Sequence, residues 1–219
     1  MMEIEVRLIF DTPPNIGSGA QVGTLADRAF IKDRNGWPYI PATTLKGQLR
    51  HVVERVARGM GRVVCDTHHQ MCRDETTACP ACAIFGSPWI PGRLCFEDLE
   101  LKEPQDLARQ RQLGKRAPRT DWRYGVSLSR RRRVAEDALL YTTELFMPGV
   151  PLTFEGVLTG PLDEVGAAWV VAGLQFLAAV GRAKSTGLGW LQAEAQVLSD
   201  GQVLNNARLR AALQQEVRP

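Results

Sequence analysis

Two different spacings of apolar residues predict the first elements of the chain. Residues 3–10 alternate apolar and polar side chains, which predicts a half-buried strand with Ile4, Val6 and Leu8 facing inward. In residues 44–58 the apolar positions recur every three or four residues, as in a helix with one side on the core. The apolar positions of that helix are Leu45, Leu49, Val52, Val53 and Val56.

Apolar runs and turn residues place the remaining elements. A loop with several Gly and Pro residues covers positions 11–36, includes a short strand near 29–32 and ends in an Asp33-Arg-Asn-Gly36 turn. The long apolar run at 165–180 predicts a buried helix. The other predicted elements are strands at 93–101, at 139–147 and 152–159 on either side of Pro148-Gly149, and at 191–197, and a short polar helix from Asn206.

The core elements follow each other in the order β-α-β-β-α-β, which is the split βαβ or ferredoxin-like plan of RNA-recognition (RRM-like) domains. We therefore expect an α+β fold in a single domain, residues 1–219, with helices on one face of a twisted antiparallel sheet. The other face would then be free to meet RNA. Two stretches are extra to this plan and are predicted to be insertions, a cysteine-rich one at 61–86 and a basic one at 102–128.

Composition agrees with one globular domain, because 44% of the 219 residues are hydrophobic and 23% are charged. No apolar run follows the first residues, and the longest run contains Gln175 and is too short to span a membrane comfortably. We expect neither a signal peptide nor a transmembrane span. Four of the five cysteines fall within eighteen residues, which suits a metal site in a reducing compartment better than disulfides, so we expect a cytoplasmic protein.

Positive charge is concentrated in one part of the chain. Between Asp106 and Arg133 there are ten Lys or Arg residues and two acids, a net +8, so the rest of the chain carries −5 of the total of +3. Such a segment is an electrostatic footprint for a polyanion. Trp122 and Tyr124 interleave with its arginines and offer ring faces for bases. A solvated basic loop without a ligand is the alternative interpretation.

The cysteine spacing predicts a structural zinc site. Cys65, Cys72, Cys79 and Cys82 supply four soft ligands in a loop-rich stretch that has few apolar residues of its own. His68 or His69 is an alternative to Cys65 as the fourth ligand. A closed set of four ligands leaves no open position for catalysis. The fifth cysteine, Cys95, falls on a predicted strand and is expected to be a small core residue.

Two further segments have features of anion binding. Pro41 predicts the helix start at 44–58, with Thr43 or Thr44 as its cap, and Lys46 in the first turn suggests an anion nearby. Gly181-Arg-Ala-Lys-Ser-Thr-Gly-Leu-Gly189 follows the buried helix, and its glycines would let the backbone approach a phosphate. We expect Lys46, the basic segment and this loop to converge on one polyanion.

These segments also carry a resemblance to a known family. Ile40-Pro-x-x-x-Leu-Lys-Gly-x-x-Arg50, Cys79-Pro-Ala-Cys-Ala-Ile-Phe-Gly86 and the loop 181–189 resemble, in the same order, motifs of the RAMP superfamily, the RNA-binding subunits of CRISPR interference complexes. The similarity is greatest to the repeated backbone subunits of type III effector complexes.

The resemblance implies a ferredoxin-like core with a zinc-binding insertion at 61–86 and a thumb-like insertion at 102–128. It implies a guide (CRISPR) RNA and a target RNA as ligands, and further copies of the chain, sister RAMP subunits and other effector-complex subunits as partners. With the charge pattern, it predicts these RNA-binding residues: Lys46, Arg50, Trp122, Arg123, Arg130, Arg182, Lys184 and Ser185.

The resemblance also implies a catalytic residue. Asp27 aligns with an aspartate with which type III backbone subunits cut target RNA beside each thumb. A carboxylate there would take a proton from a ribose 2′-hydroxyl or hold a divalent cation such as Mg²⁺ that does so. A solvated loop carboxylate is the alternative for Asp27, whereas Asp33 is explained by its turn.

Three functions remain open from the sequence. The first is a target-RNA-cutting subunit with Asp27 as the catalytic residue, a metal-dependent endoribonuclease. The second is an inactive, structural RNA-binding subunit of the same complex. The third is an unrelated zinc-containing DNA-binding protein, which leaves the Lys46 segment and the loop 181–189 unexplained. No histidine is placed for acid–base work in a glycine-rich cleft, which disfavours a histidine-dependent RNA-processing nuclease.

Overall fold

A seven-stranded antiparallel sheet forms the body of the protein in this computed structural model, which describes residues 1–17, 28–65, 70–102, 120–146 and 151–217. The strand order is β2-β4-β7-β1-β8-β9, and β3 also pairs with β7. The strands are β1 (Met2–Phe10), β2 (Tyr39–Ile40), β3 (Cys95–Phe96), β4 (Leu99–Lys102), β7 (Leu152–Gly160), β8 (Leu191–Ser199) and β9 (Gln202–Leu204).

The central strand follows the alternation seen in the sequence. In β1 the side chains of Ile4, Val6 and Leu8 are buried, while the residues between them face solvent. Ile4 pairs with Leu158 of β7 on one side and with Val197 of β8 on the other. The predicted inward face of this strand is therefore confirmed.

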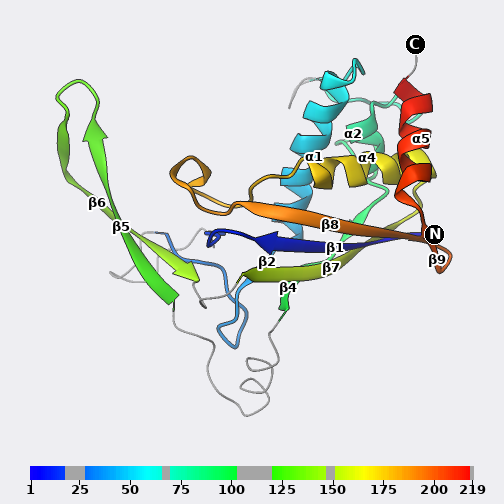
Figure 1. The fold of residues 1–219 in the computed structure, drawn as a ribbon. Coiled ribbons are helices and arrows are strands. Elements are labelled where there is room, and N and C mark those ends of the chain that lie inside the picture. The colour runs from blue at the N-terminus through cyan, green and yellow to red at the C-terminus, as the bar shows by residue number, and fades with distance from the viewer. Residues whose placement is uncertain (18–27, 66–69, 103–119, 147–150, 218–219) are drawn as a thin grey trace.

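The α-helices of the described residues all cover the same face of the sheet (Figure 1). They are α1 (Ala42–Gly59), α2 (Pro80–Phe85), α4 (Glu164–Gln175) and α5 (Asn206–Val217). Leu49 and Val53 of α1 pack closely on α4, where a Cβ atom on Gly173 would lie 2.6 Å from a Val53 methyl carbon. Gly173 thus permits the close helix contact, and burying leucine-sized side chains there contributes about 2 kcal/mol each. None of the described helices is long and apolar enough to cross a membrane.

The start of α1 differs from the prediction. Thr43 and Thr44 lie within the first turn and do not cap the helix, which has Pro41 at its N-cap position and no side-chain cap of its own. Instead, the Asp98 carboxylate accepts a hydrogen bond of 2.7 Å from the backbone N–H of Ala42. The cap is therefore supplied by a residue 56 positions away in the chain, which local sequence patterns do not reveal.

The long apolar run forms a shorter helix than predicted. α4 begins after Asp163, whose carboxylate accepts from the N–H of Gly166 at 2.7 Å, and it ends at Gln175. Val180 is buried as predicted, but it lies outside the helix. Its N–H donates to the carbonyl oxygen of Gly189 instead of to a helical partner. The predicted strand near 29–32 is likewise reduced to isolated bridges from Phe30 and Lys32.

A long β-hairpin extends away from the main sheet (Figure 1). Its strands, β5 (Thr120–Ser129) and β6 (Val134–Phe146), form a separate two-stranded sheet. We predicted that the strand at 139–147 would flank a turn with the strand at 152–159. β6 instead starts earlier and pairs with β5, so among the described residues the hairpin extends beyond the predicted insertion at 102–128.

Several predicted residues lie outside the described part of the chain, and one prediction is wrong. Asp27, His68 and His69 lie outside them, as does most of the stretch 102–128. Cys95 is exposed, because it occupies the face of β3 that points away from the helices, while Leu94 beside it is buried. The prediction that Cys95 is a core residue is therefore wrong.

Candidate functional site

The loop 181–189, between α4 and β8, turns sharply through left-handed backbone conformations. Gly181, Gly187 and Gly189 have φ angles of 100°, 90° and 72°, which residues with a side chain rarely adopt. A Cβ atom on Gly181 would lie 2.6 Å from the carbonyl oxygen of Asn15. The glycines therefore allow both the turn and the close approach of this loop to the segment that follows β1.

This loop contacts both α1 and the hairpin. Lys184 lies in a short 3-10 helix, η1 (Lys184–Thr186), and its Nζ donates to Oε1 of Gln48 on α1 at 3.2 Å. The guanidinium of Arg123 on β5 donates to the carbonyl oxygen of Thr186 at 3.2 Å. The structure thus brings together the three segments that the sequence analysis grouped.

Two polar side chains of the loop, those of Arg182 and Ser185, are exposed at its surface. Arg182 is exposed and lies against Gly17, where a Cβ atom would lie 3.0 Å from the Arg182 Nε atom. Ser185 is exposed beside it. Both are available to a ligand that approaches the loop.

On α1, the side chain that meets the loop is Gln48 rather than Lys46. Residues two apart on a helix point in nearly opposite directions, so the half-buried Lys46 lies on another flank of α1. Lys46 has no ion-pair partner within the part of the chain that the structure describes. Sequence reasoning missed Gln48 because a neutral amide adds nothing to a charge pattern.

The two faces of the hairpin differ in character. Arg123 shares one face with Tyr141, because Arg123 pairs with Thr143 and the neighbouring Gly125 pairs with Tyr141. The guanidinium of Arg28 stacks on the Tyr141 ring at 4.1 Å from its centroid. This cation-rich face is the one that contacts the loop 181–189.

Trp122 lies on the opposite face of the hairpin, so the structure does not place it beside Arg123. On that face Tyr124 is 70% exposed, Leu140 is 69% exposed and Val126 is also exposed. From the sequence, the interleaved aromatic and basic residues are expected to form one surface. Alternation in a β-strand instead separates neighbouring residues onto two faces.

A buried carboxylate connects the base of the hairpin to the body. Glu144 of β6 is 4% exposed and accepts from the Lys32 Nζ, from the Thr120 hydroxyl at 2.5 Å and from the N–H of Phe30 at 3.0 Å. Burial opposes its ionisation, but the hydrogen bonds from Lys32 and Thr120 outweigh burial and lower the pKa of Glu144. Asn15 adds a hydrogen bond of 2.7 Å from its Nδ2 to the Glu144 carbonyl oxygen.

Two other predicted RNA-binding residues lie away from the loop contacts. Arg50 donates to the Glu54 carboxylate at 2.9 Å, to the Gly86 carbonyl oxygen at 2.6 Å and to the Cys82 sulfur at 3.4 Å. These bonds commit its guanidinium to the protein interior, which weighs against the predicted RNA contact. Arg130 is exposed at the turn of the hairpin.

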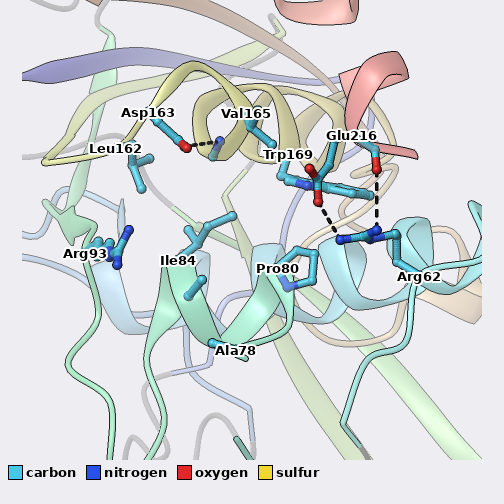
Figure 2. Close-up of a pocket in the computed structure, with 12 residues that line it drawn as sticks. Arg62, Ala78, Pro80, Ile84, Arg93, Leu162, Asp163, Val165, Trp169 and Glu216 are labelled. Atoms are coloured by element: carbon cyan, nitrogen blue, oxygen red, sulfur yellow. Dashed lines mark hydrogen bonds and ion pairs between the residues drawn. The ribbon is translucent and has the colours of Figure 1, made fainter. Parts of the chain in front are cut away.

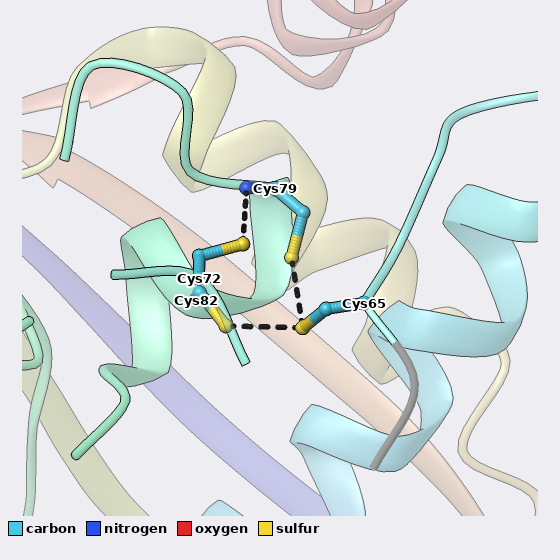
Figure 3. Close-up of side chains that lie close together, drawn as sticks. All are labelled: Cys65, Cys72, Cys79 and Cys82. Atoms are coloured by element: carbon cyan, nitrogen blue, oxygen red, sulfur yellow. Dashed lines mark hydrogen bonds between the residues drawn. The ribbon is translucent and has the colours of Figure 1, made fainter. Parts of the chain in front are cut away.

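Four cysteine sulfurs form a second candidate site (Figure 3). The sulfur atoms of Cys65, Cys72, Cys79 and Cys82 all lie within 4.8 Å of one another. Cys65 lies 3.4 Å from Cys82 and 3.7 Å from Cys79, sulfur to sulfur. Tetrahedral zinc–sulfur bonds of about 2.3 Å place the sulfurs about 3.8 Å apart, so the four thiols form a group that could hold a metal ion such as zinc.

Hydrogen bonding and burial act in opposite directions on these thiols. The backbone N–H of Cys79 donates to the Cys72 sulfur at 3.3 Å, and Arg50 donates to Cys82, so both contacts favour thiolates. Burial and the adjacent Cys82 thiol raise the pKa of Cys65 to about 12. Metal binding must therefore displace protons. Because Cys79 and Cys82 are part of the main hydrophobic core, the cluster is built into the body of the protein.

The sheet face opposite the helices is acidic. Five carboxylates and two cations point outward from its strands, a net −3, and we call this surface the outer sheet face. Its charged residues are Glu3, Glu5, Arg7, Glu100, Lys102, Glu155 and Glu194. We expected this open face to meet RNA, but like charges would repel the RNA backbone there. That expectation is therefore not supported, and the positive charge lies instead around the loop 181–189.

A small hollow on the helix side carries no evident chemistry. It has a volume of about 210 Å³ and lies between α2, α4 and α5, with Pro80, Ile84 and Trp169 in its walls (Figure 2). Arg62 is paired with Glu216 at 2.5 Å at one side of it. Because the nearby charged groups are paired with each other, we assign no function to this hollow.

Comparison with known proteins identifies the family. A sequence model of the RAMP superfamily matches residues 7–192, and the chain therefore belongs to the RAMP superfamily. RAMP proteins generally bind RNA and act in multisubunit complexes, and the superfamily includes CRISPR-associated proteins. A search of curated proteins returned no match.

Proposed function

We propose that the chain is a guide-RNA-binding backbone subunit of a type III CRISPR effector complex. The observation that carries this proposal is the meeting of α1, the hairpin and the loop 181–189. Arg123, Arg182 and Lys184 place three cations around this junction. A strand of RNA needs such a row of positive charges, because its phosphates dominate its affinity for proteins.

The strand order supports a ferredoxin-like core for this subunit. The two β-α-β halves are β1-α1-β4 and β7-α4-β8, and their strands lie in the order β4-β7-β1-β8. In RNA-recognition domains of this plan the open sheet face meets RNA. In this chain, the acidic outer sheet face favours RNA binding at the edge where the loop 181–189 lies.

The hairpin supports the role of a thumb. Its face with Arg123 and Tyr141 belongs to the basic junction, while the opposite face presents Tyr124, Val126 and Leu140 to solvent. Exposed apolar and aromatic side chains on a projecting hairpin fit between unstacked bases, since base stacking on a ring is worth about 1–3 kcal/mol. The hairpin would hold a nucleotide of the target strand out of its stack.

We further propose that the subunit cleaves target RNA through Asp27 with a divalent cation such as Mg²⁺. The support is the position of Asp27 in the family's motif order and its neighbour Arg28, whose backbone is bonded to Thr142 and Glu144 at the base of the hairpin. The Asp27 carboxylate would accept the 2′-hydroxyl proton while the 2′-oxygen attacks the adjacent phosphorus in line. The bond from phosphorus to the 5′-oxygen of the next nucleotide would break, that oxygen would take a proton from water, and the other fragment would end in a cyclic 2′,3′-phosphate.

Cleavage of complementary RNA by the assembled complex tests this proposal. Asp27→Ala should abolish regularly spaced cuts while guide binding is retained. Asp11→Ala removes an exposed loop carboxylate elsewhere and should cut like the wild type. If Asp27→Ala also cuts like the wild type, Asp27 is not catalytic. If the wild-type complex binds target RNA without cutting it, the subunit is an inactive structural component.

A further inference from the structure

The outer sheet face has the features of a protein-docking surface. It contains a hollow of about 580 Å³ lined by Glu5, Arg7, Glu155, Glu194 and Gln196. A surface that is both concave and net negative attracts a convex, positively charged partner and repels nucleic acid.

Part of the negative charge on this face is not neutralised. Arg7 is bonded to Glu155 at 2.6 Å and lies 3.4 Å from Glu194, and Lys102 is also bonded to Glu155 at 2.7 Å. Both cations are thus directed at the same carboxylate. Glu5 has no ion-pair partner among residues placed by the structure, and Glu194 is 60% exposed. The hollow therefore keeps carboxylates available to a cationic partner.

The chain also carries a surface of matching charge. Four consecutive arginines form the turn between β5 and β6, and we call Arg130–Arg133 the arginine turn. The turn is held in shape because the N–H of Arg133 donates to the Ser129 carbonyl oxygen at 2.7 Å. Arg132 is bonded to Glu136, and within the described ranges the other three arginines have no ion-pair partner.

We propose that the arginine turn of one copy docks into the hollow of the outer sheet face of a second copy. The turn lies at the far end of the hairpin from the main sheet (Figure 1), so it is presented to a neighbouring molecule. The contact joins two different surfaces, which leaves the pair of molecules with a free turn at one end and a free face at the other. Such a head-to-tail contact propagates into an open chain or a ring.

This proposal rests on the proposed assembly of several copies along one guide RNA, and it adds the protein surface that joins them. Three arginines of the turn have no ion-pair partner among the described residues, and the face carries a net −3, so the two charges are opposite in sign and similar in size. Attraction of this kind weakens at high salt, because exposed charges are screened beyond about 8–10 Å.

Charge reversal on both sides tests the docking, with the self-association of RNA-free protein measured by sedimentation at low and high salt. Glu5→Lys/Glu194→Lys on the face, or Arg131→Glu/Arg133→Glu in the turn, should each weaken self-association about tenfold or more. Mixing the two variants should restore assembly, because each supplies the surface that the other needs. The matched control is Glu75→Lys/Glu216→Lys, which reverses two charges on the helix side and should associate like the wild type.

The outcomes separate this proposal from the RNA-binding proposal. The docking is wrong if the wild type stays monomeric at low salt, if the control weakens association as much as the face variant, or if mixing restores nothing. Glu5→Lys/Glu194→Lys should bind a short single-stranded RNA at least as tightly as the wild type, because the change removes negative charge and leaves the loop 181–189 intact. A protein that assembles as predicted but binds no RNA would contradict the proposed function and leave the docking intact.

Discussion

Glu144→Gln is the perturbation that tests how the hairpin is fixed to the body. The wild-type carboxylate is 4% exposed and accepts three hydrogen bonds, from Lys32, Thr120 and the N–H of Phe30. A hydrogen bond to a charged group contributes about 1.5–3 kcal/mol. Glutamine keeps the side-chain volume and one acceptor oxygen. The Lys32 side chain is 30% exposed, so the Lys32 ammonium can reach water when the carboxylate is lost. We therefore expect a loss of about 2 kcal/mol at neutral pH.

Glu144→Ala should cost more than Glu144→Gln. It removes every acceptor at once and leaves the N–H of Phe30 and the Lys32 ammonium without their partner. Removing one member of a buried charged pair costs about 3–5 kcal/mol, and the partial exposure of Lys32 places the expectation at the lower end of that range. Lys32→Met in the Glu144→Gln background should add little, because the two side chains act as a pair.

The pH dependence gives the sharper test. The pKa of Glu144 is lower in the folded protein than in the unfolded chain, so its contribution is fully present above the unfolded pKa of about 4.3. It is lost as the pH falls through the folded pKa. The stability gap between the wild type and Glu144→Gln should therefore be widest near pH 7 and close in acid.

Urea denaturation at several pH values, followed by circular dichroism, measures this gap. Glu194→Gln is the control, since its carboxylate is 60% exposed and its loss should change stability by less than about 0.5 kcal/mol. The reasoning is refuted if Glu144→Gln is as stable as the wild type at pH 7, or if the gap stays constant down to low pH.

Two further predictions concern the cysteine cluster and the loop. Cys79→Ser should lower the bound zinc from about one ion per chain and destabilise the fold, because only three thiolates remain and the site belongs to the core. Native mass spectrometry measures the zinc content, and an unchanged content would contradict this prediction. Cys95→Ser, which changes an exposed cysteine, is the control. Gly181→Ala should lower the free energy of unfolding by about 1–3 kcal/mol and weaken RNA binding. The reason is that the added Cβ would lie 2.6 Å from the Asn15 carbonyl oxygen, at a residue with a φ of 100°. Gly47→Ala is the control and should bind RNA like the wild type, because nothing lies within 4 Å of its added Cβ.

Local patterns were sufficient to predict most elements and the cysteine group. The alternation of β1, the stripe of α1 and the polar tail helix α5 all depend on neighbours within a few residues. The cysteines could be grouped because thiol ligands at short spacing have few other uses. Of the four, Cys79 and Cys82 lie at the start and within the short helix α2.

Features that depend on long-range contacts could not be predicted. The cap of α1 comes from Asp98, and the partner of β6 is set by register with β5 rather than by the following turn. Arg50 matched a motif associated with RNA, yet its partners are Glu54 and groups near the cysteine cluster. The charge of the outer sheet face emerged only when the strand order placed glutamates from several strands side by side.

The central claim is that the loop 181–189 and the hairpin bind one RNA strand together, and the salt dependence of RNA affinity tests it most directly. Each phosphate contact contributes about 0.7 to the slope of log affinity against log salt for a single strand. The triple variant Arg123→Gln/Arg182→Gln/Lys184→Gln should therefore lower that slope by about 2. The matched control, three exposed arginines elsewhere, is Arg73→Gln/Arg93→Gln/Arg210→Gln. The account predicts that the control keeps a slope close to that of the wild type, while the triple variant has a lower slope. Equal slopes for all three proteins would contradict the account.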